Sequence, residues 1–174
     1  MSASDGTPGV FAALTEPLRR WWRSRGHGVH SPYAYRFIRN VLREKGHYYN
    51  YSEIDRLGGD THWHRLLFRL VCEFEPQQLL ATHLSVDERK VIRLADSRVN
   101  LPPEVSVPDN MPPGVMELRG AVTMAMVIRD IRSDIRRWDN LLETLRGGMT
   151  FTNGTVGIVV ERPGLPRQDF RINF

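Results

Sequence analysis

The stretch at 75–96 constrains the fold of this chain more than any other, because it predicts a strand, a turn and a helix in succession. The apolar run at 79–81 is typical of a strand covered on both faces, and we predict a strand over 77–84. Ser85 and Glu88 have the spacing of a capping box, which predicts that a helix opens at Ser85. Strand, turn and helix in this order form the unit that binds nucleotide-like cofactors in α/β folds.

The turn after this strand lacks the residue type that a cofactor site needs. It reads THLS, and no glycine occurs between Gly59 and Gly114. Glycine lets a backbone approach a bound cofactor closely, whereas the side chains of this turn are bulkier. Thr82, His83 and Ser85 are therefore candidate cofactor-binding residues by their position alone.

Local signals divide the rest of the chain into helices and strands. Ser31 with Pro32, and Asp60 with Thr61, are helix-start signals, and the NG dipeptide at 153–154 indicates a tight turn between two strands. Residues 1–8 are predicted to be disordered, further helices are predicted at 10–25, 52–57 (capped by Ser52) and 134–145 (capped by Ser133 or Asp134), and further strands at 122–129, 149–153, 155–161 and 170–174.

The chain is basic, with a formal net charge of +4, and nearly all of its cations are arginines; Lys45 and Lys90 are its lysines. An Arg-rich chain can bind phosphate backbones. The basic residues are spread along the whole sequence, however, so we favour a solvated surface over a nucleic-acid-binding one.

The remaining composition gives no sign of catalysis, metal binding or a membrane span. Cys72 is the single cysteine, which excludes an internal disulfide and favours a reducing cytoplasm, and we interpret it as an inert residue near the packed side of its helix. No apolar stretch reaches the length of a membrane span, and the first residues do not form a signal peptide. His27, His30, His62 and His64 lack the spacing of a zinc site, so we predict no metal site and no catalytic residue.

The predicted helix at 10–25 is amphipathic and carries Trp21 and Trp22 on its apolar stripe. One interpretation is a basic helix that lies on a membrane or on nucleic acid. The other is a helix that docks on the domain or on a second copy of the chain, and its wide stripe favours this one. A homodimer through Trp21 and Trp22 is the partner that the sequence suggests, beside an unidentified protein partner.

Several segments together resemble a known family. HGVHSP at 27–32, a tyrosine pair at 48–49 and LLFRLVCEFEPQQLL at 66–80 resemble the start of a bacterial family of class I methyltransferase-like proteins that use S-adenosylmethionine (SAM). The resemblance resumes at 121–131, which resembles the fifth strand and its acidic turn, and at 135–174, which resembles the last helix, the closing hairpin and the aromatic end. This resemblance implies a methyltransferase-type fold and SAM as the cofactor.

The chain departs from the family where the family binds its cofactor. The family's Gly-rich loop is replaced by THLS at 82–85, and its second strand, with an acidic end that holds the ribose hydroxyls, would fall in the short proline-rich stretch at 98–120. We expect that strand and the next strand–helix pairs to be shortened or lost. Of the acidic residues after the fifth strand only Asp130 is present, and we expect Arg129 and Arg132 to neutralise it. Asp130 is the fourth candidate cofactor-binding residue.

We therefore predict an α/β fold, a reduced Rossmann-like mixed sheet of methyltransferase type flanked by helices, with an N-terminal helical extension. The predicted organisation is a disordered tail at 1–8, a helical segment at 9–60 and a truncated α/β domain at 61–174. Three functions are open: a non-catalytic interaction or structural protein with no cofactor, a working SAM-dependent methyltransferase with an atypical cofactor site, and a basic nucleic-acid-binding module. We favour the first.

Overall fold

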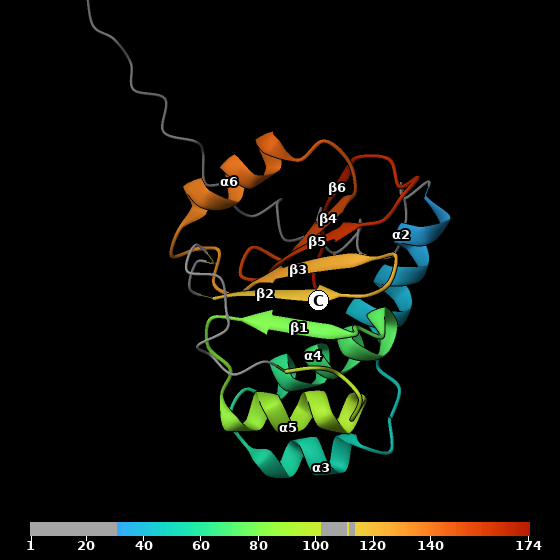
Figure 1. The fold of residues 1–174 in the computed structure, drawn as a ribbon, viewed down its shortest axis with the longest axis vertical. Coiled ribbons are helices and arrows are strands. Elements are labelled where there is room, and N and C mark those ends of the chain that lie inside the picture. Colours follow the sequence, from blue (N-terminus) through green and yellow to red (C-terminus); the bar gives the residue numbers. More distant parts are fainter. Residues whose placement is uncertain (1–30, 102–110, 112–113) are drawn as a thin grey trace, which may run out of the picture.

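The computed structural model describes residues 31–101, 111 and 114–174, and these form a mixed six-stranded sheet with helices on both faces (Figure 1). The prediction of an α/β fold with a mixed sheet flanked by helices is confirmed. The predicted tail at 1–8 and helix at 10–25, with Trp21 and Trp22, lie outside the described residues. No helix within the described ranges is long and apolar enough to cross a bilayer.

The elements follow one another in the order that the sequence predicts, with one exception described below. The helices are α2 (Pro32–Phe37), which continues into the π-helical turn η1 (Ile38–Leu42), then α3 (Tyr51–Leu57), α4 (Thr61–Phe74), α5 (Val86–Ala95) and α6 (Ile135–Thr144). The strands are β1 (Gln78–Ala81), β2 (Val115–Arg119), β3 (Met124–Ile128), β4 (Met149–Thr152), β5 (Gly157–Glu161) and β6 (Gln168–Arg171).

The strand order is β1-β2-β3-β5-β4-β6. Every neighbouring pair is antiparallel except β4 and β6, which run parallel. β1 and β3 run in the same direction, because both are antiparallel to β2. β4 runs in this direction too, because β3 and β4 are both antiparallel to β5, and β6 is parallel to β4. The carboxyl ends of β1, β3, β4 and β6 consequently meet at one edge of the sheet.

The sequence predicts shortened or lost strands within 98–120 and does not predict the strand that the structure has there. β2 lies inside this stretch, between β1 and β3, with Leu118 opposite both Leu79 and Ala125. The proline pairs that precede it hide the strand in the sequence, because five residues without clear alternation give a weak local signal. β2 forms because it pairs with a strand on each side, and the local sequence carries no sign of that pairing.

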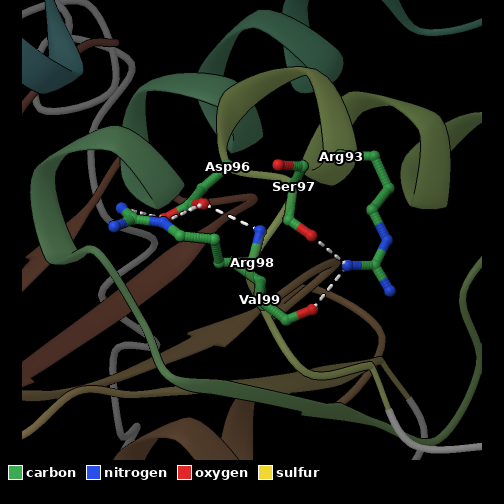
Figure 2. A network of polar contacts seen from close by, with 5 residues as sticks. All are labelled: Arg93, Asp96, Ser97, Arg98 and Val99. Atoms are coloured by element: carbon green, nitrogen blue, oxygen red, sulfur yellow. Dashed lines mark hydrogen bonds and ion pairs between the residues drawn. The ribbon is translucent and has the colours of Figure 1, made fainter.

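A short return segment follows α5 along the outer side of β1. The amide of Leu79 donates to the Asn100 carbonyl at 3.0 Å, and the amide of Asn100 donates to the Gln77 carbonyl at 2.9 Å, which makes a single parallel bridge. Arg93 of α5 holds this segment, because its Nη1 donates to the carbonyls of Ser97 and Val99 at 2.7 Å each (Figure 2). β1, α5 and Asn100 thus form a strand–helix–strand unit whose second strand is one bridge long.

Two apolar clusters fill the space on the two faces of the sheet. The larger lies between the sheet and α2, η1, α3, α4 and α5, and the rings of Phe37 and Phe151 meet there with centroids 4.8 Å apart. The smaller lies under α6, where Trp138 is buried at 2% exposure. In Figure 1 α6 lies at the top of the view and α3 and α5 at the bottom, with the strands between them. The helices at 32–57 therefore share one core with the sheet.

Most helix caps were predicted from local sequence. Ser31, Asp60, Ser85 and Asp134 each accept a hydrogen bond from an amide in the first turn of the helix that follows. Ser52 does not cap α3: the N-cap is Asn50, two residues earlier, and the Ser52 hydroxyl donates to the Tyr49 carbonyl instead. The carbonyls of Tyr48 and Asn50 accept the first backbone hydrogen bonds of that helix, so Ser52 falls inside its first turn.

Two further predictions need correction. The helical spacing of Ile135, Trp138, Leu141, Leu142 and Leu145 predicts an apolar stripe, but Trp138 is the only buried residue of α6 and Ile135 is 51% exposed. Cys72 was placed near the packed side of α4, but it is exposed. Burial of its thiol among neighbouring atoms and the negative charges of Asp96 and Glu75 nevertheless raise the Cys72 pKa, so little of it is thiolate at neutral pH.

Candidate functional site

The carboxyl ends of β1 and β3 lie one strand apart, separated by the start of β2. In the register of the sheet Ala81 is opposite Met116, and Val115 is opposite Ile128. The turn after β1 and the turn after β3 therefore meet at the same edge. In α/β folds with parallel strands, ligands bind outside the carboxyl ends of strands at such a position.

The turn after β1 places its candidate residues in different environments. His83 and Ser85 are exposed, Thr82 is half-buried, and Leu84 turns into the core at 6% exposure. Ser85 caps α5 in the predicted capping box: its hydroxyl accepts from the Glu88 amide at 3.1 Å, and its own amide donates to Glu88 Oε2 at 2.8 Å. The Ser85 amide, which lies just after the carboxyl end of β1, is therefore already hydrogen-bonded to the side chain of Glu88.

Glu88 is the centre of a polar network at this edge. Its other oxygen, Oε1, accepts from the Trp63 indole nitrogen at 2.7 Å and from Arg129 Nη1 at 2.6 Å. The Arg129 guanidinium also lies over the Trp63 ring, 4.7 Å from its centroid. The Glu88 side chain is 6% exposed and that of Arg129 is 44% exposed, so the ion pair joins a buried carboxylate to a half-exposed cation. α4, α5 and the end of β3 are linked by this network, which we call the Glu88 network.

The Glu88 network keeps its carboxylate ionised. Burial alone would raise the pKa of Glu88. The hydrogen bonds from the Ser85 amide, the Trp63 indole and the Ser85 side chain, together with the charge of Arg129, outweigh burial and lower the pKa below the usual value for glutamate. An ionised carboxylate whose oxygens both accept strong hydrogen bonds is a poor general acid, and its partners leave little room for it to act as a base.

Asp130 lies at the same edge but outside the Glu88 network. It adopts a left-handed backbone conformation, with φ of 54°, and its carbonyl accepts from the Ser133 hydroxyl at 2.7 Å. The expectation that Arg129 and Arg132 neutralise Asp130 is wrong: Arg129 pairs with Glu88, and Arg132 Nε donates to the Gly154 carbonyl. Both arginines therefore interact with other groups, and the sequence does not show these contacts.

The histidines that the structure describes are dispersed. His64 is buried at 5% exposure with its Nδ1 unpartnered, whereas the neighbouring His62 is exposed. No group of three or more His, Cys, Asp or Glu side chains that could hold a metal ion occurs within the described part of the chain. His27 and His30 lie outside that part.

The side chains of the Glu88 network were not among the candidate residues that the sequence suggested. Thr82, His83, Ser85 and Asp130 all lie at the expected edge, yet the side chains that interact there most strongly are those of Trp63, Glu88 and Arg129. Glu88 was interpreted only as a helix-capping residue. A capping box uses only one carboxylate oxygen of its glutamate. The second oxygen of Glu88 was therefore free to accept hydrogen bonds from other residues, and this was the available sign of a further partner.

Comparisons with known proteins return no match: no family model matches the chain, and neither does any curated protein or solved structure. The resemblance to methyltransferase-like proteins is therefore carried by the residues of this chain alone and stays a prediction.

Proposed function

We propose that this protein is a degenerate member of the SAM-dependent methyltransferase-like family, and that it acts as a non-catalytic structural or interaction protein. Two features of the described residues support this proposal. One is the strand–helix–strand unit around β1, and the other is the Glu88 network at the mouth of that strand.

The unit formed by β1, α5 and Asn100 has the connectivity of the first half of a nucleotide-binding fold. In such folds a strand, a helix and a second parallel strand follow in order, and an acidic residue at the end of the second strand binds the ribose. Here the second strand is a single bridge between Gln78 and Asn100, held by Arg93 (Figure 2). Among the residues that the structure describes, this bridge is the one pairing seen beside the outer side of β1, and we propose that the position of the ribose ligand has been lost with the shortened strand.

The observation that carries the proposal is the internal use of polar groups at the mouth of β1. A cofactor at this position would need the amides that open α5. The Ser85 amide instead donates to Glu88, and both Glu88 oxygens are engaged by Ser85, Trp63 and Arg129. A cofactor carboxylate or ribose would have to displace an ionised carboxylate from three donors, which costs several kcal/mol in a buried setting.

The proposed partner is a second copy of the chain, joined through the segment with Trp21 and Trp22 that the sequence predicts to be helical, and a different protein partner is the alternative. The proposed compartment is the cytoplasm, on the strength of the single Cys72. Light scattering after size exclusion tests the dimer. We expect the full chain to be dimeric and the double variant Trp21→Ser, Trp22→Ser to be monomeric; a monomeric unmodified chain would remove the homodimer from the proposal.

A titration with SAM and S-adenosylhomocysteine tests the loss of cofactor binding. Calorimetry should give no binding heat, and the melting temperature should not move. A ligand at a hundred times its dissociation constant stabilises the native state by about 2.7 kcal/mol. For a domain of this size that stabilisation raises the melting temperature by roughly 5–10 °C. A shift of that size, in parallel with a known SAM-binding methyltransferase as positive control, would favour the working enzyme instead.

A further inference from the structure

A basic cavity lies away from the Glu88 network. It has a volume of about 490 Å³ and lies between the loop that follows η1, the 62–69 part of α4 and the last two residues of the chain. Four Lys or Arg side chains line it, against one acidic side chain, that of Glu44. Glu44 is committed to its own loop, where its Oε1 accepts from the Gly46 amide. The cavity therefore has an excess of positive charge.

Arg69 at the base of this cavity is a buried cation without a charged partner. It is 6% exposed, and its Nε donates to the Val41 carbonyl at 2.5 Å while its Nη1 donates to the Tyr51 hydroxyl at 3.0 Å. Both acceptors are neutral, and within the described ranges no carboxylate forms an ion pair with Arg69. A buried charge is normally paired, because removing it from water costs several kcal/mol. An anion in the cavity would supply the missing countercharge.

Other cations around the cavity differ in how far they are already engaged. Arg65, one helical turn before Arg69, is bound by both oxygens of Asp55 at 3.0 and 2.6 Å. Lys45 is exposed and forms no ion pair with any residue that the structure describes, and His62 also lines the cavity. Arg69 of α4 and Lys45 of the loop are thus two cations of this lining that no carboxylate of the described residues pairs with.

The walls of the cavity add an aromatic component. Tyr51 and Phe174 line it together with these cations, and the Arg65 guanidinium lies over the Tyr51 ring at 4.9 Å. The volume lies in the range of small-molecule sites, which combine apolar walls with a few polar groups that fix orientation. Guanidinium and ammonium groups together are the donors that bind phosphate oxygens best.

We propose that this cavity binds a small organic phosphate, a phosphate monoester or diphosphate, whose phosphate oxygens contact Arg69 and Lys45 and whose organic part lies against Tyr51 and Phe174. The proposal is independent of whether the protein has lost SAM binding, because none of these residues belongs to the Glu88 network.

Calorimetric titration of the full chain with pyrophosphate and with inorganic phosphate tests the proposal, and the two lysines of the chain provide a matched pair of variants. We expect pyrophosphate to bind more tightly than inorganic phosphate, because it presents more charge to Arg69 and Lys45. Lys45→Glu should weaken pyrophosphate binding about tenfold or more, which corresponds to roughly 1.4 kcal/mol. Lys90→Glu makes the same charge change on α5, where Lys90 pairs with Asp87 at the surface, and should change the affinity less than about twofold.

Arg69→Met should abolish pyrophosphate binding in a protein that still melts cooperatively. Because Arg69 is buried, this variant can fail to fold, and Lys45→Glu, at an exposed position, then decides the question alone. Absence of measurable pyrophosphate binding would overturn the proposal. Equal losses in Lys45→Glu and Lys90→Glu would also overturn it, because binding would then follow net charge rather than the cavity. A single-stranded oligonucleotide that binds more tightly than pyrophosphate and is equally sensitive to Lys45→Glu would replace the small ligand with nucleic acid.

Discussion

The indole nitrogen of Trp63 donates a 2.7 Å hydrogen bond to Oε1 of Glu88, across 25 residues of sequence. This contact joins the first turn of α4 to the first turn of α5 and places both beside the end of β3, where Arg129 completes the ion pair. One glutamate thus caps its own helix with one oxygen and ties two other elements to it with the other.

Removal of the Glu88 carboxylate should destabilise the fold. Glu88→Gln loses the ion pair with Arg129 and weakens the bonds from Trp63 and Ser85, and each unsatisfied buried donor costs about 1–3 kcal/mol. We expect a total loss at the lower end of this range, because Arg129 is half-exposed and can reach water. Urea denaturation measures the loss, with the exposed Glu143→Gln on α6 as control. A variant as stable as the unmodified chain would show that the Glu88 network contributes nothing to stability.

Acid should weaken the fold through the same residue. The folded pKa of Glu88 lies below the value of about 4.3 for an unfolded glutamate, so its contribution is fully present above that pH and is lost as the pH falls through the folded pKa. Unfolding free energies measured from neutral pH downward should therefore fall less steeply below about pH 4.3 in Glu88→Gln than in the unmodified chain. Identical slopes in the two proteins would contradict the lowered pKa.

Gly157 should not tolerate a side chain. A Cβ at this position in β5 would lie 2.4 Å from Cζ3 of Trp138, the residue that anchors α6 to the sheet. Gly157→Ala must displace Trp138 and should cost about 1–3 kcal/mol or more. Gly147→Ala is the matched control, because its Cβ would meet no atom closer than 3.9 Å. Melting temperatures of the two variants measure the difference, and a normal melt for Gly157→Ala would show that α6 can shift at no cost.

Cys72 should react slowly for an exposed cysteine. Burial around its sulfur and the charges of Asp96 and Glu75 raise its pKa, so the reactive thiolate is scarce at neutral pH. The rate of alkylation by iodoacetamide, followed by mass, should be lower in the folded chain than in the urea-unfolded chain, and the single cysteine makes the signal unambiguous. Equal rates would mean that the folded environment leaves the thiol unchanged.

Arg93 should control the bridge beside β1. Without its two bonds to the carbonyls of Ser97 and Val99, the return segment loses its attachment to α5 (Figure 2). Arg93→Met should therefore speed hydrogen exchange at the Leu79 amide, which donates to Asn100, and reduce stability by about 1–2 kcal/mol. Arg98→Met removes a solvent-exposed pair with Asp96 and should leave that amide protected. Equal exchange in both variants would contradict a positioning role for Arg93.

What the sequence determined about this protein is local. The caps at Ser31, Asp60, Ser85 and Asp134 were predictable because an N-cap side chain binds an amide only a few residues away. The hairpin turn at Asn153 was predictable for the same reason, since its Oδ1 accepts from the amides of Thr155 and Val156. The α/β class followed from the order of these elements.

Tertiary structure decided which residues far apart in the sequence contact one another. β2 exists because strands on both sides pair with it, and the Glu88 network exists because packing brings α4 and the end of β3 to the first turn of α5. Arg69 and Lys45 line the same cavity because the loop after η1 brings Lys45 to α4. Contacts of this kind depend on the summed packing of the whole chain, and a short window of sequence carries no signal of them.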